Sequence, residues 1–171
     1  HAEGVSFVEE HAAAFIDEPV DIVVTSSAGY PLDLTLYQAV KGLTAVLPIV
    51  KEGGTILIAA RCAEGIGGPE FSELLLQTAS VVEFRQRLAD PDFFVIDQWQ
   101  LQELCKVLEK ADVGLFSEGI ATQYHGDVLV ELLPSIEQGL QNALGDDGDN
   151  ARIAVIPKGP YVLTKVRGER Q

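Results

Sequence analysis

Three polar side chains have the spacing of neighbours on one helical surface, where two of them, Gln38 and Lys41, could bind one anion together. Tyr37 and Gln38 precede Lys41 by four and three residues, and residues at that spacing are adjacent on a helix. An ammonium group supplies charge and a carboxamide supplies an oriented neutral donor, so Gln38 and Lys41 suit a carboxylate or a hydroxyl group. Exposed helices also carry glutamine and lysine for solubility, and a half-buried tyrosine needs no function. Spacing alone therefore leaves a binding role and a purely solvated role both open.

Metal-binding or catalytic histidines are not indicated by the sequence. His1, His11 and His125 have neither paired spacing nor a neighbouring ligand motif, so we expect each to be an ordinary surface or structural residue. The acidic, glycine-rich stretch 145–150 resembles a calcium loop, but it lacks the alternate-residue ligand spacing and the distal glutamate. We expect a solvated loop there, no metal site, and no catalytic residue in this chain.

The elements that would position Gln38 and Lys41 follow from the apolar pattern. Continuous apolar runs without polar alternation are typical of strands that are buried on both faces of a sheet. Such runs lie at 20–24 (ending near Ser26), 55–60, 113–116 and 153–156. Helical spacing is found at 4–17, 33–48 (with Asp33 as a good N-cap), from 69 onward, 96–110 and 128–144.

Strands that alternate with helices predict an α/β domain. We expect a three-layer sandwich with a mostly parallel sheet of about four strands, Rossmann-like but without the dinucleotide fingerprint. Ligands of such sheets bind outside the carboxyl ends of the strands. Three segments should meet there: 26–31 with the start of the following helix, 61–69 and 117–126.

Residues 21–41, Asp-Ile-Val-Val-Thr-Ser-Ser-Ala-Gly-Tyr-Pro-Leu-Asp-Leu-Thr-Leu-Tyr-Gln-Ala-Val-Lys, resemble the C-terminal-domain signature of the nickel-pincer-nucleotide-dependent lactate racemase family. Residues 53–68 resemble the second strand and glycine loop of the same family. The resemblance covers about the first half of the chain in detail and the second half in pattern. In that family the glutamine and lysine of a Tyr-Gln-x-x-Lys motif contact the substrate. The resemblance thus implies substrate binding by Gln38 and Lys41 beside Tyr37, and Trp99 lies about where the family has an aromatic residue facing the active site.

The resemblance also implies a reaction. A hydride would leave the carbon that bears the hydroxyl group of a 2-hydroxy acid or sugar acid, pass to a nickel-pincer nucleotide, and return to either face. In the family, the paired catalytic histidines, the lysine that holds the cofactor and the nickel-binding histidine belong to the N-terminal region, and no counterpart is found here.

We therefore expect residues 1–171 to be the C-terminal domain of a larger racemase or epimerase, without its catalytic and cofactor-binding region. The absence of methionine fits a piece of a longer chain. On this view the nickel-pincer nucleotide is held mainly by the N-terminal domain, which is also a partner of this one. The isolated piece should carry no cofactor and should be inactive.

Composition excludes other classes. The chain has 26 acidic and 12 basic residues and a formal net charge of −14, which argues against nucleic acid as a partner. Its apolar runs are far shorter than the roughly 20 residues that span a bilayer, and no secretory signal is visible. We expect a cytoplasmic protein without membrane contact, in which Cys62 and Cys105 are reduced, packed thiols.

Two alternatives remain at this stage. A nucleotide-dependent oxidoreductase would share the strand-helix-strand unit, but it needs Gly-x-Gly-x-x-Gly directly after its first strand. Gly65, Gly67 and Gly68 follow the second strand instead, with a different spacing. A non-catalytic interaction domain is the other alternative, because a fold does not imply a function.

Overall fold

The computed structural model describes residues 2–168, and its centre is a five-stranded parallel sheet. The strand order is β5-β4-β3-β2-β6, and every neighbouring pair is parallel. A separate parallel pair joins β1 to β7. The strands are β1 (Ala13–Ile16), β2 (Val20–Ser26), β3 (Val50–Ala59), β4 (Ala111–Phe116), β5 (Glu131–Leu133), β6 (Ile153–Ile156) and β7 (Leu163–Val166).

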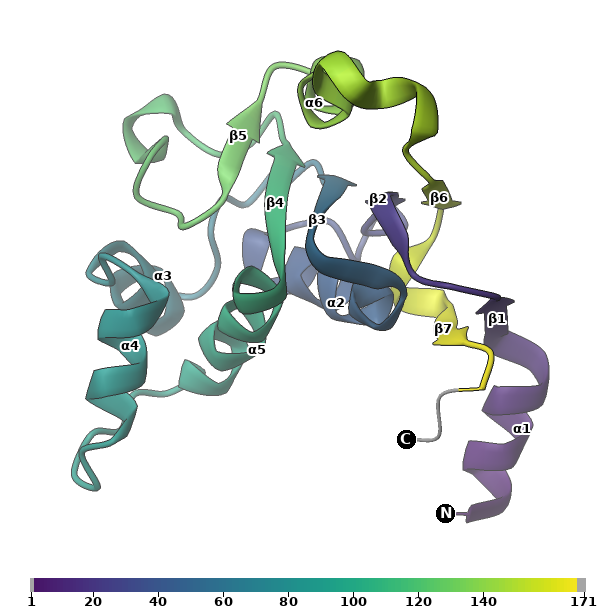
Figure 1. Ribbon diagram of the computed structural model, residues 1–171. Helices are drawn as coiled ribbons and strands as arrows, with labels where there is room; N and C mark the ends of the chain where they lie inside the picture. Colours follow the sequence, from purple (N-terminus) through teal and green to yellow (C-terminus); the bar gives the residue numbers. More distant parts are fainter. Residues whose placement is uncertain (1, 169–171) are drawn as a thin grey trace.

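Helices lie on both faces of the sheet, so the expected three-layer α/β architecture is confirmed (Figure 1). Helices α2 and α5 pack against one face with α3 and α4 beside them, and α6 lies over the other face. The helices are α1 (Ala2–Ala12), α2 (Leu36–Val46), α3 (Pro69–Leu76), α4 (Val81–Leu88), α5 (Gln98–Lys110) and α6 (Ile136–Leu144). Short 3-10 turns follow at η1 (Leu47–Ile49), η2 (Thr122–Tyr124), η3 (Gly145–Asn150) and η4 (Gly159–Tyr161).

The core is unequal on the two faces of the sheet. The α2 and α5 face holds the larger cluster of buried side chains, including Val23, Ile58, Leu43 and Leu104. The α6 face holds a smaller cluster centred on three buried residues, Ile22, Leu57 and Leu133. Because burying one such side chain contributes about 1.5 to 3 kcal/mol, the α2 and α5 side provides most of the hydrophobic stabilisation. Helix α2 is thereby fixed firmly to the sheet.

The main sheet has five strands where the sequence predicted about four. The prediction failed because residues 128–144 were interpreted as one helix, whereas 131–133 form β5 and only Ile136–Leu144 are helical. Pro134 separates the two elements, and Ser135 caps α6 by accepting a 3.1 Å hydrogen bond from the amide of Gln138. An N-cap of this kind defines a helix start that apolar spacing alone does not reveal.

Two helix boundaries also differ from the prediction. The helix predicted at 4–17 ends at Ala12, because Ala13–Ile16 pair with β7 and this long-range pairing overrides the local helical spacing. Helix α2 is capped by Thr35, not by Asp33. Helix α4 was not predicted, and its N-cap is Ser80.

The connections explain where a ligand site can form. The chain runs from β2 outward through β3 and β4 to β5, and α6 then carries it back across the sheet to β6 beside β2.

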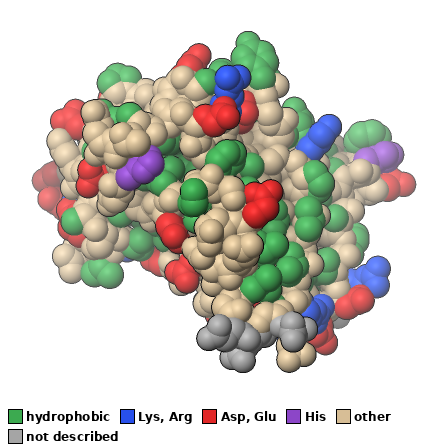
Figure 2. All heavy atoms as spheres, turned by 90° about the horizontal axis from the view of Figure 1, so that it is seen from above, with side chains coloured by type: hydrophobic (Ala, Val, Ile, Leu, Met, Phe, Trp, Pro, Cys, Tyr) green, Lys and Arg blue, Asp and Glu red, His purple; other side chains and the backbone are tan. Residues whose placement is uncertain are grey.

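Acidic side chains are spread over the face that is seen from above, and basic ones are fewer (Figure 2). Within residues 2–168, no helix has the length and the apolar character that crossing a bilayer requires.

Candidate functional site

The amino end of α2 is closed by the chain itself. The side-chain oxygen of Thr35 accepts a 3.2 Å hydrogen bond from the amide of Gln38. The other two free amides of the first turn donate to backbone carbonyls of the glycine loop: Leu36 to Gly65 and Tyr37 to Ile66. A dinucleotide fold leaves these donors open for a pyrophosphate. The glycine loop engages the amides of Leu36 and Tyr37, and Thr35 engages that of Gln38. This engagement argues against the nucleotide-dependent oxidoreductase.

Gln38 and Lys41 are in direct contact on the outward surface of α2. The ammonium of Lys41 donates a 2.7 Å hydrogen bond to the Oε1 atom of Gln38, which leaves the Nε2 group of Gln38 pointing away from that contact. Lys41 forms no ion pair with any residue that the structure describes. The pair thus presents an ammonium and an amide donor side by side, as binding of an anion or a hydroxyl group requires.

Tyr37 connects this pair to the aromatic residues of α3 and α5. Its ring contacts Phe71 and Trp99 edge to face, with centroids 5.1 and 5.9 Å apart, and the Nζ atom of Lys41 lies 6.0 Å from the ring centroid. Burial and the nearby carboxylate of Asp97 raise the pKa of Tyr37 above its ordinary value. The phenol therefore stays protonated at neutral pH, where it acts as a hydrogen-bond donor.

The structure brings the four sequence-predicted residues together. Tyr37, Gln38 and Lys41 come from α2, and Trp99 comes from the first turn of α5. Trp99 is 49% exposed, so one side of its ring contacts Tyr37 while the rest is open to a ligand or to another domain. Tryptophan is enriched where an apolar body must also meet water or a partner. The four side chains therefore lie together on one surface, which α2 and the start of α5 form.

The three loops at the carboxyl ends of the strands also meet, as expected, but they form a separate cavity. The amide of Gly119 and the hydroxyl of Ser117 both donate to the carbonyl of Arg61, at 2.9 and 3.0 Å. The Arg61 guanidinium lies 3.4 Å from the Glu118 carboxylate. A cavity of about 340 Å³ is lined by Ser26, Gly29, Asp33, Ala59, Ala60, Arg61, Phe116 and Glu118. Gln38 and Lys41 are not among the residues that line this cavity. The cavity at the sheet edge is therefore separate from the outward surface of α2 that carries Gln38 and Lys41, which we call the α2 face.

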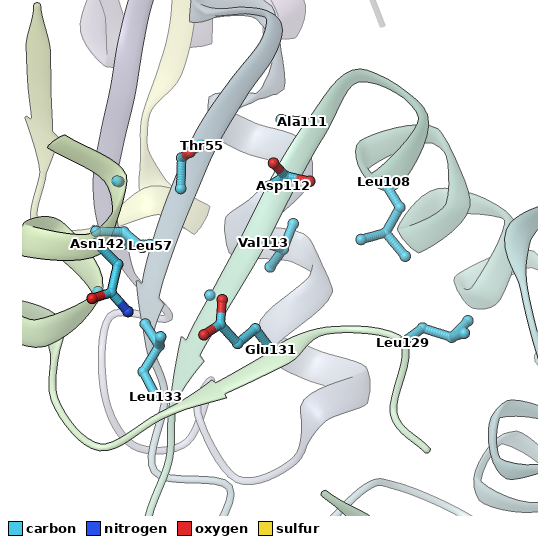
Figure 3. Close-up of a pocket in the computed structure, with 13 residues that line it drawn as sticks. Thr55, Leu57, Leu108, Ala111, Asp112, Val113, Leu129, Glu131, Leu133 and Asn142 are labelled. Atoms are coloured by element: carbon cyan, nitrogen blue, oxygen red, sulfur yellow. The ribbon is translucent and has the colours of Figure 1, made fainter. Parts of the chain in front are cut away.

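A second cavity of about 340 Å³ lies along β4, lined by α6 on one side and by the end of α5 on the other, and was not foreseen (Figure 3). Its polar lining consists of Thr55, Asp112, Glu131 and Asn142, from β3, β4, β5 and α6. Sequence reasoning missed it because residues 128–144 were assigned to one helix, which removed β5 and its Glu131 from the sheet. A Cβ atom at Gly139 of α6 would come within 2.5 Å of Leu133 in β5, which shows how closely α6 approaches the strands here.

The cysteines and histidines supply no evident reactive group. Cys62 and Cys105 are free and buried, as predicted, and burial raises the pKa of each thiol to about 11. His11 is exposed and stacks on Phe7, and His125 is exposed on the loop after η2. His1 lies outside the described residues. Among residues 2–168, no three His, Cys, Asp or Glu side chains are grouped as a metal site would need.

Comparisons with known proteins converge on one family. A family described as the lactate racemase C-terminal domain matches residues 16–164. A lactate racemase of Thermoanaerobacterium thermosaccharolyticum is 33% identical over 167 residues, and one of Lactiplantibacillus plantarum is 34% identical over 168 residues. Each match covers 96% of this chain but only 39% of the relative. The chain therefore spans about two fifths of the length of these relatives.

Solved structures agree with the sequence comparisons. The lactate racemase apoprotein of Thermoanaerobacterium thermosaccharolyticum superposes with a TM-score of 0.86 at 34% identity, over 96% of this chain and 40% of that one. A Thermotoga maritima protein superposes with a TM-score of 0.64 at 12% identity, over 97% of this chain and 41% of that one. The second likeness shows a shared fold alone.

Proposed function

We propose that this chain, which belongs to the lactate racemase C-terminal domain family, supplies the substrate-binding side chains of a cytoplasmic racemase or epimerase acting on 2-hydroxy acids or sugar acids. The observation that carries the proposal is the contact between Lys41 and Gln38 beside the half-exposed Trp99. The proposal takes residues 1–171 as one domain of a larger enzyme, because the relatives named lactate racemase are longer than this chain.

Each residue has a distinct role in this proposal. The Lys41 ammonium binds the substrate carboxylate by a charge-assisted hydrogen bond. Because Lys41 holds the amide oxygen of Gln38 at 2.7 Å, the Nε2 group of Gln38 is turned outward and donates to the carboxylate or to the 2-hydroxyl oxygen. Trp99 forms an apolar wall, and Tyr37 supports that wall from behind through the edge-to-face contact. Exclusion of water by such a wall strengthens both polar contacts.

The nickel-pincer nucleotide that the family resemblance implies does not fit this chain alone. The described residues contain no group of three metal-binding side chains, and the amides at the start of α2 are engaged by backbone and Thr35 oxygens. We therefore assign the cofactor, which would accept and return the hydride, to the part of the protein outside this chain. In this proposal, residues 1–171 bind and orient the substrate and carry out no other step of the reaction.

The test is an assay of the full-length protein, supplied with nickel-pincer nucleotide, against a panel of chiral 2-hydroxy acids. Chiral chromatography should show each enantiomer of at least one acid converting to the same racemic or epimeric mixture, without net oxidation. Net oxidation that requires a nicotinamide nucleotide would support the oxidoreductase alternative. Absence of turnover over the whole panel would leave a non-catalytic interaction domain and overturn the proposal.

A further inference from the structure

Three contacts link the N-cap and the first turn of α5 to a single residue of α2, Tyr37. The Oδ1 atom of Asp97 accepts a 3.3 Å hydrogen bond from the hydroxyl of Tyr37. The Nε2 group of Gln100 donates a 2.7 Å hydrogen bond to the backbone carbonyl of the same tyrosine. Trp99, between them in sequence, contacts the Tyr37 ring edge to face at 85°. The phenol, the ring and the backbone of Tyr37 are thus all held by the first residues of α5 and its N-cap.

Gln100 is an unusual residue for its surroundings. It is 1% exposed, and its Oε1 atom has no hydrogen-bond partner among the described residues. Leaving a polar atom buried and unpaired is costly, so glutamine is disfavoured at this position unless the other end of its amide makes a compensating contact. The amide is useful at this position only through its Nε2 bond to Tyr37, which fixes the position of α2 relative to α5.

Asp97 has a backbone conformation that serves the same contact. It is the N-cap residue of α5 and has a φ of 65°, in the left-handed region that aspartate and asparagine tolerate better than most residues. Its side chain does not cap its own helix, although aspartate is among the preferred capping residues. Instead, the carboxylate reaches across to the phenol of Tyr37.

We propose that Asp97 and Gln100 are positioning residues that hold Tyr37, and thereby orient Gln38 and Lys41 relative to Trp99. This inference rests on the proposed function, because Asp97 and Gln100 can affect the reaction only if Gln38 and Lys41 bind the substrate. Neither residue needs to touch the substrate. Their effect reaches the substrate through Tyr37, the neighbour of Gln38 in sequence and of Lys41 in space.

Kinetics of the full-length enzyme test this role. Gln100→Met keeps the shape of the side chain and removes the amide, and Asp97→Gly keeps the left-handed backbone but removes the carboxylate. Each variant should lower kcat/KM roughly ten- to a hundredfold, as misplacement of a binding group does. Asp97→Asn retains an acceptor oxygen and should recover most of the loss. Gln102→Met, on the same helix but half-buried, is the matched control and should leave kcat/KM unchanged.

A double-mutant cycle separates positioning from general destabilisation. If Gln100 acts through Lys41 and Gln38, the effects of Lys41→Ala and Gln100→Met on kcat/KM should not be additive. The fold-loss in kcat/KM that Lys41→Ala causes should then be at least threefold smaller in the Gln100→Met background than in the wild type. Equal losses in both backgrounds would mean that Gln100 has a merely structural role. That result would overturn the inference even if both single variants are slow.

A fluorescence measurement makes the inference independent of activity. Trp99 is the single tryptophan of residues 1–171, and its emission in the full-length protein is isolated by subtracting the spectrum of the Trp99→Phe variant. Gln100→Met and Asp97→Gly should shift this difference spectrum to the red and increase quenching by acrylamide, whereas Gln102→Met should not. An unchanged Trp99 spectrum would overturn the positioning role. A wild-type protein without racemase activity would instead overturn the proposed function, and the spectra would still decide the role of Asp97 and Gln100.

Discussion

Lys41 donates a 2.7 Å hydrogen bond to the side-chain oxygen of Gln38, so the two side chains form one polar pair and not two independent surface groups. The contact engages the oxygen end of the Gln38 amide, because an ammonium can only donate. The groups that this contact leaves available, the Nε2 group of Gln38 and the remaining N–H groups of Lys41, are then all hydrogen-bond donors. This polarity matches the oxygen-rich end of a 2-hydroxy acid and would not suit a cationic ligand.

The first prediction is that residues 1–171 fold without the rest of the enzyme. The described part contains a complete five-stranded sheet with helices on both faces and a contiguous core on the α2 and α5 side. Thermal melting followed by circular dichroism should give one cooperative transition. A gradual loss of signal without a transition would show that this domain needs its partner region to fold.

The second prediction concerns the buried thiols and the pH dependence of stability. Burial raises the pKa of Cys62 and of Cys105 from 9.0 to about 11, so the folded state favours the protonated thiol. The resulting stabilisation is fully present below pH 9 and is lost as the pH rises toward 11. The melting temperature should therefore fall over this window.

A Cys62→Ala, Cys105→Ala double variant isolates the contribution of the thiols, because other side chains also titrate at high pH. It should lose less stability than the wild type between pH 9 and 11. Native protein at pH 8 should also react slowly with a disulfide reagent, since only the thiolate attacks. Rapid labelling of both cysteines without unfolding would contradict their burial.

A third prediction tests the contact between the loops after β3 and β4. A Cβ atom at Gly119 would lie 1.8 Å from the carbonyl oxygen of Cys62, and backbone cannot move away as a flexible side chain can. Gly119→Ala should lower the free energy of unfolding by at least about 2 kcal/mol, the cost of overpacking. Gly4→Ala is the control: no atom of the described residues lies within 4 Å of its added Cβ, so the variant should be neutral or slightly stabilised. Equal stability of the two variants in urea denaturation would disprove the close approach.

Local pattern was sufficient to predict the elements that position the candidate site. The apolar run at 20–24 and the helical stripe after it correspond to β2 and α2, which carry Gln38 and Lys41. Three-residue spacing also predicted that these two side chains are neighbours, and the structure shows them in contact.

Features that depend on long-range pairing could not be predicted in this way. Residues 13–16 have helical spacing, and only their pairing with Leu163–Val166, far along the chain, makes them a strand. The edge-to-face contact of Trp99 with Tyr37 and the bond from Gln100 to the Tyr37 carbonyl also join residues more than sixty positions apart. Composition and periodicity carry no information about such partners, and the position of Trp99 was suggested only by resemblance to the family.

The fourth prediction is that residues 1–171 alone neither retain nickel nor racemise a substrate. The described residues offer no cluster of three metal-binding side chains, and the proposed reaction needs a hydride acceptor that we assign to the rest of the protein. Elemental analysis after dialysis against a nickel salt, together with a polarimetric assay, would check both statements. Stoichiometric nickel or measurable turnover would mean that the catalytic residues lie in this domain after all.

The fifth prediction addresses the two residues that would bind the substrate in the full-length enzyme. Lys41→Ala removes a charge-assisted hydrogen bond worth about 1.5 to 3 kcal/mol, so kcat/KM should fall roughly ten- to a hundredfold. Gln38→Ala removes a neutral donor worth about 1 kcal/mol, so its effect should be nearer fivefold. Lys106→Ala is the matched control, because Lys106 is an exposed lysine of α5 that pairs only with its neighbour Glu103, and it should leave the kinetics unchanged.

The steady-state kinetics of Lys41→Ala, measured beside Lys106→Ala in an enzyme of verified racemase activity, test the central claim most directly. We predict a loss of at least tenfold in kcat/KM for Lys41→Ala. If the Lys41 contact is equally strong in the ground state and the transition state, the loss should come from a higher KM. If the contact strengthens during the reaction, the loss should come from a lower kcat. Wild-type kinetics in Lys41→Ala would contradict the assignment of the α2 face as the substrate-binding site.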